Sequence, residues 1–238
     1  MKGYRSDFDL LIIVNNRKLC DFAEYWQKAA DRLNRDKAIA TPVSFIVHTR
    51  REVNTYLKDA QYFFSDIRKE GIVLYELDDE PLAEPGVLTP GDRLRLAKEH
   101  YDERIALSQT FLKGATFYVS EKDFKVAAFE LHQSLEQAFS CVLLTLTNYA
   151  PPSHNIKFLR VLAEEQDRRL TDAFPRDQHR ERAWFNTLNE AYVKARYSKH
   201  FEISEEALAW LIERTIILQQ LVKLVCEEHL ARLEKLAG

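Results

Sequence analysis

Two carboxylates, Asp7 and Asp9, are separated by one residue where the apolar segment FDLLIIV begins. That segment is rich in β-branched residues and is typical of a buried strand, along which side chains alternate between two faces. Asp7 and Asp9 therefore point the same way, and two carboxylates on one face can share a Mg²⁺ ion that also holds phosphate oxygens. The spacing alone favours the simpler interpretation, in which two acids solvate the end of a strand.

The composition is that of a globular protein with a core. Of 238 residues, 46% are hydrophobic and 30% charged, and the net charge of -3 provides no general attraction for nucleic acid or membrane. The three cysteines, Cys20, Cys141 and Cys226, are far apart and fit reduced thiols better than a disulfide framework. No apolar run is long enough to cross a bilayer and no secretory signal is evident, so we expect a cytoplasmic protein without a membrane partner.

The first 76 residues alternate between strand and helix patterns. A helix is expected over 20–35, a second strand over 41–48, a short helix over 51–60 and a third strand over 71–76, in GIVLYE. Strands separated by helices indicate an α/β domain. Three prolines and two glycines over 77–93 then predict a linker.

Residues 94–238 show only helical periodicity. Amphipathic stripes and cap residues predict about five helices, the last beginning after Ser204 with Glu205 and Glu206 in its first turn. Short connections between such helices predict an all-α bundle. We therefore expect an α+β protein with a domain over 1–76, a linker over 77–93 and a helical bundle over 94–238.

The stretch SDFDLLIIV resembles the metal-binding strand of the small, MNT-like nucleotidyltransferases of the polymerase-β type. The resemblance implies a mixed sheet, Mg²⁺ on Asp7 and Asp9, and a contact of Ser6 with a bound NTP. Two parts of the family pattern differ here. The Gly-Ser turn that precedes the strand has no counterpart in this sequence, and Ser44 stands where relatives often carry a third acid.

The helical half resembles HEPN domains. Residues 129–163 resemble the second and third helices of that family, and ARYSKHFEIS resembles its Arg-His signature, with three residues between Arg196 and His200 instead of the usual four to six. The resemblance implies a homodimer in which His200 transfers a proton at a ribose 2′-OH and Arg196 stabilises phosphate charge. The alternatives are a cation at the end of a helix for Arg196 and an exposed loop side chain for His200.

Other residues near this signature have simpler interpretations. Tyr192 and Tyr197 flank Arg196, and either could stack a base of a nucleotide or be the tyrosine that a nucleotidyltransferase modifies in toxin–antitoxin pairs. For Tyr192, packing against the neighbouring helix is the favoured interpretation. His132 is expected to be a satisfied histidine on a helix, and His154 to anchor the start of the third helix of the bundle.

Three functions are compatible with these patterns. The first is transfer of a nucleoside monophosphate from an NTP to a protein or small-molecule acceptor, with Mg²⁺ on Asp7 and Asp9. The second is a nucleotide- or RNA-binding HEPN module without turnover. The third is a HEPN ribonuclease that uses Arg196 and His200.

Overall fold

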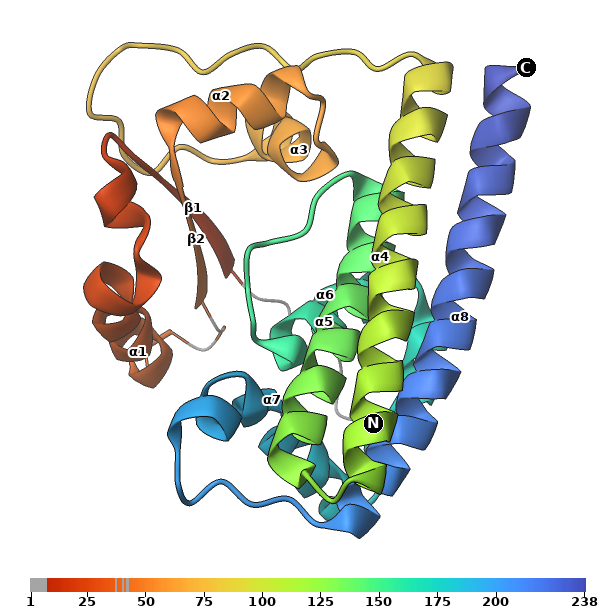
Figure 1. Cartoon of the computed structure of the whole chain (residues 1–238). Coiled ribbons are helices and arrows are strands. Elements are labelled where there is room, and N and C mark those ends of the chain that lie inside the picture. Colours follow the sequence, from red (N-terminus) through yellow and green to blue (C-terminus); the bar gives the residue numbers. More distant parts are fainter. Residues whose placement is uncertain (1–7, 37, 40, 42) are drawn as a thin grey trace. The chain divides into compact units, whose positions relative to one another are not determined.

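The computed structural model describes residues 8–36, 38–39, 41 and 43–238. The chain divides into two compact units, Met1–Val87 and Leu88–Gly238 (Figure 1). Within the part of the chain that is described, no helix is both long and apolar enough to cross a bilayer.

The first unit contains a small parallel sheet. Strand β1 (Phe8–Val14) pairs with β2 (Val43–Thr49), with Phe8 opposite Val43 and Val14 opposite Thr49. The crossover between them consists of η1 (Arg17–Cys20), the π-helix η2 (Phe22–Trp26) and α1 (Gln27–Arg35). The first two predicted strands are therefore present, in the βαβ arrangement that parallel pairing requires. The helix predicted over 20–35 is a π-helix followed by α1.

Two helices complete this unit. The helix α2 (Arg50–Lys58) begins at a capping box, in which Thr49 and Glu52 each bond the other's backbone N–H, and α3 (Tyr62–Glu70) follows after a short turn. Val53, Leu57 and Phe64 are each 1% exposed and form the unit's small core.

The prediction of a third strand, and with it a mixed sheet, is wrong. Residues 71–76 are all described and form no strand, and the sheet of the described residues has two parallel strands. Ile72 and Leu74 are 86% and 76% exposed. An apolar, β-branched run satisfies local strand preference, but a strand also needs a neighbour for its N–H and C=O groups, and none pairs with this segment.

The second unit is a helical bundle, as predicted. Its helices, all within described residues, are α4 (Pro90–Ser120), α5 (Phe124–Thr147), α6 (Ile156–Gln166), α7 (His179–Tyr197) and α8 (Glu205–Ala237), with the 3₁₀ helix η3 (Arg168–Ala173) after α6. The long helices α4, α5 and α8 run side by side and contact one another (Figure 1). Helix α4 begins inside the segment predicted as linker, because Thr89 caps it and Pro90 occupies its first turn.

Small residues let α4 and α5 approach closely. The Ser108 and Ser134 hydroxyls each donate to the other residue's carbonyl at 2.8 Å, and the Gln219 amide of α8 donates to Ser108 Oγ at 2.8 Å. A Cβ atom at Gly114 would lie 2.9 Å from a carboxylate oxygen of Glu130. These contacts fix the register of α5, the helix that carries His132 and Glu136.

Candidate functional site

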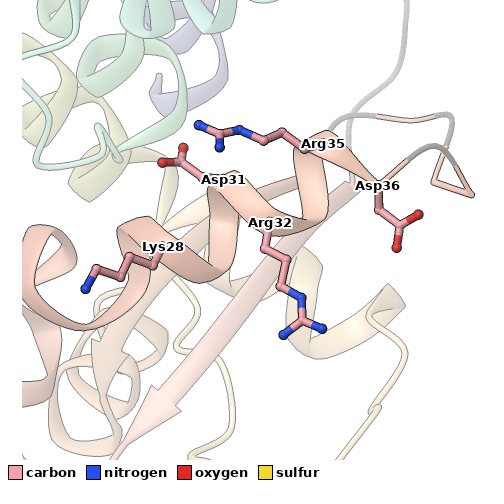
Figure 2. A pocket seen from close by; sticks show the side chains of 5 residues that line it. All are labelled: Lys28, Asp31, Arg32, Arg35 and Asp36. Carbon is pink, nitrogen blue, oxygen red and sulfur yellow. The ribbon is translucent and has the colours of Figure 1, made fainter.

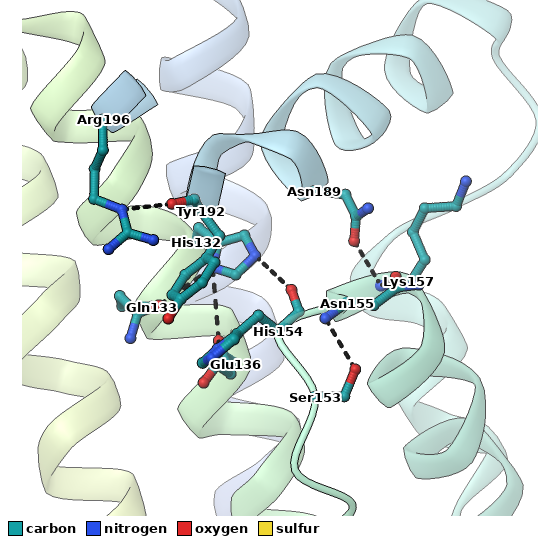
Figure 3. A network of polar contacts seen from close by, with 10 residues as sticks. All are labelled: His132, Gln133, Glu136, Ser153, His154, Asn155, Lys157, Asn189, Tyr192 and Arg196. Atoms are coloured by element: carbon teal, nitrogen blue, oxygen red, sulfur yellow. Dashed lines mark hydrogen bonds and ion pairs between the residues drawn. The ribbon is translucent and has the colours of Figure 1, made fainter. Parts of the chain in front are cut away.

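A network of polar and aromatic side chains joins α5, the loop before α6 and α7 (Figure 3). Helix α5 presents His132 and Glu136, four residues apart and therefore on one face, while α7 presents Tyr192 and Arg196 with the same spacing. His154 is contributed by the loop that ends at α6. We call these five residues the α5–α7 site.

His154 and Glu136 form a carboxylate–histidine pair. The His154 Nδ1 atom lies 3.0 Å from Glu136 Oε2. Because an ionised carboxylate only accepts hydrogen bonds, Nδ1 carries the proton and donates it, which leaves Nε2 as an acceptor in the neutral ring. The Glu136 side chain is 12% exposed and that of His154 53% exposed, so the carboxylate lies behind an imidazole that solvent reaches.

His132 holds the backbone of His154 from inside the bundle. It is fully buried, and its Nε2 atom donates to the His154 carbonyl oxygen at 3.0 Å. Burial lowers the pKa of His132 to about 4, mainly because the charged ring would lose its hydration. A neutral His132 with its proton on Nε2 cannot donate to Glu136, 3.8 Å from Nδ1, so the charge of Glu136 is left for His154.

The Tyr192 ring connects His154 to Arg196. Its centre lies 3.7 Å from that of the His154 ring, and the planes are 14° from parallel. The Arg196 guanidinium carbon, Cζ, lies 4.3 Å from the same Tyr192 centre, and Arg196 Nε donates to the Tyr192 carbonyl at 2.6 Å. Cζ of Arg196 is therefore at most 8.0 Å from the His154 ring centre, the sum of the 4.3 Å and 3.7 Å distances.

The guanidinium of Arg196 carries an uncompensated charge. The side chain is exposed, and no carboxylate of a described residue forms an ion pair with it. It lies 5.1 Å from the centre of the Phe129 ring as well as over Tyr192, so aromatic faces hold it in place. An exposed, oriented guanidinium without an acidic partner is suited to contact a phosphate or another anion.

Hydrogen bonds hold the loop of His154 against the bundle. The Asn155 side chain caps α6 by accepting from the backbone N–H groups of Lys157 and Phe158. Asn189 of α7 also accepts from the Lys157 N–H, at 3.1 Å, and Ser153 Oγ accepts from the Asn155 N–H (Figure 3). The position of His154 is thus set by contacts on both sides of it.

A family model for the HEPN domain matches residues 101–225, which is more than half of the 238 residues. The chain belongs to the HEPN family. No curated protein matches it. The matched range contains all five members of the α5–α7 site, so the network belongs to the HEPN bundle itself.

The three residues predicted from the HEPN signature, Arg196, Tyr197 and His200, lie in different surroundings. Arg196 is part of the α5–α7 site. Tyr197 follows it at the end of α7 and is 76% exposed. His200 is exposed in the segment between α7 and α8. Its backbone N–H donates to Ser198 Oγ at 3.2 Å, and its imidazole has no hydrogen-bond partner among the residues described. Roles in catalysis or base stacking for these side chains stay predictions.

Sequence reasoning did not assign His132 and Glu136 to a site, and for Tyr192 it favoured packing against the neighbouring helix over a role beside Arg196. His132 is indeed a satisfied buried histidine, and the loop of His154 does anchor the start of α6. The signal that was available is the repeated spacing: His132 with Glu136, and Tyr192 with Arg196, each place two polar side chains on one helical face. That both faces meet His154 depends on packing between helices distant in sequence.

The predicted metal ligands are only partly within the described residues. Ser6 and Asp7 lie outside them, whereas Asp9 is exposed near the start of β1, and its backbone pairs with that of Ser44. Among residues 8–36, 38–39, 41 and 43–238, no group of three or more His, Cys, Asp or Glu side chains is placed to hold a metal ion. The described residues alone therefore do not make a Mg²⁺ site.

Two pockets carry charged residues. The first, of about 450 Å³, lies along α1, and its lining side chains point in different directions instead of converging (Figure 2): Lys28, Asp31, Arg32, Arg35 and Asp36. The second, of about 430 Å³, lies in the bundle and is lined by aromatic rings and cations of α6, α7, α8 and the loop before α7. Two cations of this pocket, Arg160 and Arg176, both form ion pairs with the buried Glu164. Glu164 therefore neutralises part of the pocket's positive charge.

Proposed function

We propose that the HEPN bundle binds RNA, with Arg196 as a phosphate contact. The observation that carries this proposal is the exposed Arg196 guanidinium, which aromatic rings orient and which no described carboxylate neutralises. Such a group gains more from a phosphate than a guanidinium already paired with an acid, because no existing ion pair must be broken.

Neighbouring groups support a nucleic acid as the ligand. Tyr197, the next residue, exposes 76% of its surface and is available to stack on a base, which is how single-stranded RNA is held without reading its sequence. The net charge of -3 means that binding must come from such a local site. HEPN domains often bind RNA and form dimers, and we propose a homodimer for this chain as well.

Fluorescence anisotropy with a short labelled single-stranded RNA tests this proposal. Arg196→Ala is expected to weaken binding by roughly 10- to 100-fold, the value of one charge-assisted contact. It should also reduce the slope of log K against log salt by about 0.7, since one phosphate contact is lost. Arg180→Ala is the matched control: Arg180 lies on the same helix and is exposed, but it pairs with Glu206 at 2.7 Å.

Equal losses in the two variants would contradict the proposal, because they would show that general positive charge is responsible. An unchanged affinity in Arg196→Ala would contradict it as well. Melting temperatures of both variants should be measured first, so that a loss of binding is compared between folded proteins.

Nucleotidyl transfer from an NTP, with Mg²⁺ on Asp7 and Asp9, is a second proposal for the first unit. It is supported by the pairing of Asp9 with Ser44, which brings the position matched to the family's third acid beside Asp9. Mg²⁺ with an NTP is expected to raise the melting temperature of the wild type and not that of Asp9→Asn, since a ligand that binds the native state stabilises it. Absence of any shift in the wild type would rule the proposal out.

A further inference from the structure

We propose that His154 is the general base of an RNA-cleaving reaction at the α5–α7 site, with Glu136 as its positioning residue. This inference rests on the proposed RNA binding. It differs from the assignment that the family signature gives, which uses His200. The reaction is attack of a ribose 2′-oxygen on the adjacent phosphate.

The His154–Glu136 pair has the arrangement that base catalysis requires. Nδ1 of His154 donates to Glu136 Oε2 at 3.0 Å, which fixes the tautomer in which Nε2 bears a lone pair. Nε2 has no hydrogen-bond partner among the described residues, and the side chain is 53% exposed. A substrate hydroxyl can therefore reach the basic nitrogen, while the carboxylate behind it stabilises the ring once it is protonated.

The ring is also held rigidly. Tyr192 stacks on it with 3.7 Å between ring centres, and the buried His132 donates to the His154 carbonyl at 3.0 Å. Contacts on the ring face, the ring edge and the backbone thus define one orientation. Such preorganisation is what separates a catalytic histidine from a mobile surface histidine, because misplacing the base by a small distance costs much of its effect.

Arg196 lies at a suitable distance to share the substrate. Its Cζ atom is within 8.0 Å of the His154 ring centre, the sum of 4.3 Å and 3.7 Å. A phosphate bound to the guanidinium would bring the neighbouring ribose toward His154. The guanidinium would then offset the negative charge that develops on the phosphorane oxygens.

The chemistry balances without a metal or cofactor. His154 Nε2 accepts the 2′-OH proton, O2′ forms a bond to phosphorus, and the bond from phosphorus to the 5′-oxygen breaks. The leaving 5′-oxygen takes a proton from water, and the protonated His154 returns its proton to the hydroxide that results. The products are an RNA with a 2′,3′-cyclic phosphate and an RNA with a 5′-hydroxyl.

The test uses the purified chain of 238 residues and two labelled oligonucleotides, one of RNA and one of identical sequence with 2′-O-methyl riboses. The wild type is expected to cleave only the RNA. His154→Ala should lower kcat by about 100-fold or more, with RNA affinity retained. Added imidazole should restore part of the activity of His154→Ala, which it would not do if the residue were only structural.

Glu136→Gln tests the positioning role. The glutamine amide can donate to Nδ1 and so place the proton on Nε2, which removes the base, so kcat should fall while KM stays nearly constant. His154→Gln, which keeps a planar polar side chain in the stack, serves as a second variant if His154→Ala does not fold. His179→Ala, an exposed histidine at the start of α7, is the matched control and should cleave like the wild type.

Three results would overturn the inference. The first is a wild type that binds RNA but releases no product, which would leave the proposed binding function intact. The second is activity that survives His154→Ala and His154→Gln but is lost in His200→Ala. The third is cleavage of the 2′-O-methyl oligonucleotide, which has no 2′-OH proton. A wild type that does not bind RNA at all would remove the binding proposal and this inference together.

Discussion

The imidazole of His154 lies flat on the phenol ring of Tyr192, with 3.7 Å between the ring centres and 14° between the planes. The two residues belong to segments that are separate in the sequence, the loop before α6 and the helix α7. The stack therefore connects the histidine of the α5–α7 site to the helix that carries Arg196. Substitution of Tyr192 can measure how much this stack contributes to stability, because Tyr192 can be changed without altering a charge.

Tyr192→Phe should retain the stack, and Tyr192→Leu should lose it. We expect the free energy of unfolding of the phenylalanine variant to lie within about 0.5 kcal/mol of the wild-type value, since the ring remains. The leucine variant should lose roughly 1 kcal/mol beyond its change in buried area, the usual worth of an aromatic pair. Urea denaturation of the three proteins measures the difference, and equal losses in both variants would show that the ring contact contributes nothing.

The buried His132 should make the bundle less stable in acid. Its folded pKa is about 4, below the value near 6.5 of an unfolded chain. As the pH falls from about 6.5 to about 4, the unfolded state therefore binds a proton that the native state does not, and the free energy of unfolding decreases. The full effect of one such group is about 3 kcal/mol.

His132→Gln isolates this effect, because glutamine can still donate to the His154 carbonyl but does not titrate. Urea denaturation at pH 7 and pH 4.5 should show a smaller loss of stability in the variant than in the wild type. Burial also lowers the pKa of His48 and His229, so the comparison must be the difference between the two proteins at each pH. The same acid loss in both would contradict the prediction.

The ion pairs of Glu164 should matter far more than those on the surface. Glu164 is 6% exposed, accepts from Arg160 Nε at 2.6 Å and also binds Arg176, while Arg160 is itself buried. Glu164→Gln leaves a buried guanidinium without its counter-charge, which typically costs about 3–5 kcal/mol. Glu206→Gln breaks the exposed pair with Arg180 and should cost less than about 1 kcal/mol.

Urea denaturation of both variants measures these costs. Similar, small losses in Glu164→Gln and Glu206→Gln would mean that water or another acceptor compensates the buried guanidinium. The melting curves should also keep the same denaturant slope, since neither change alters how much surface unfolding exposes.

The helical half was predictable because its information is local. The stripe expected on the last helix is buried throughout its length, as shown by Leu208, Leu211, Leu218, Val222 and Val225. A periodicity of 3.6 residues with one apolar face leaves few alternatives to a helix that packs on others. Breaks at prolines and caps such as Ser204 then mark the ends.

The third strand and the α5–α7 site were not predictable in the same way. GIVLYE has strand composition over 71–76, but pairing depends on an available edge, which the segment itself does not encode. His132 and His154 are 22 residues apart and meet through a hydrogen bond from side chain to backbone. Only the packing of α5 against the loop and α7 decides that contact, whereas the sequence alone made Arg196 and His200 the natural pair.

Residues 88–238 should fold without the preceding unit. The bundle's core lies entirely within this range, from Ala115 to Cys226, and its helices supply their own caps. A fragment that starts at Leu88 is therefore expected to show a helical circular dichroism spectrum and one cooperative urea transition. Leu135→Ala in the fragment, at a fully buried site of α5, should lower its stability by about 2–5 kcal/mol. A fragment without a cooperative transition would show that the bundle depends on residues 1–87. A cooperative fragment that Leu135→Ala leaves unchanged would show that its core is not packed around Leu135.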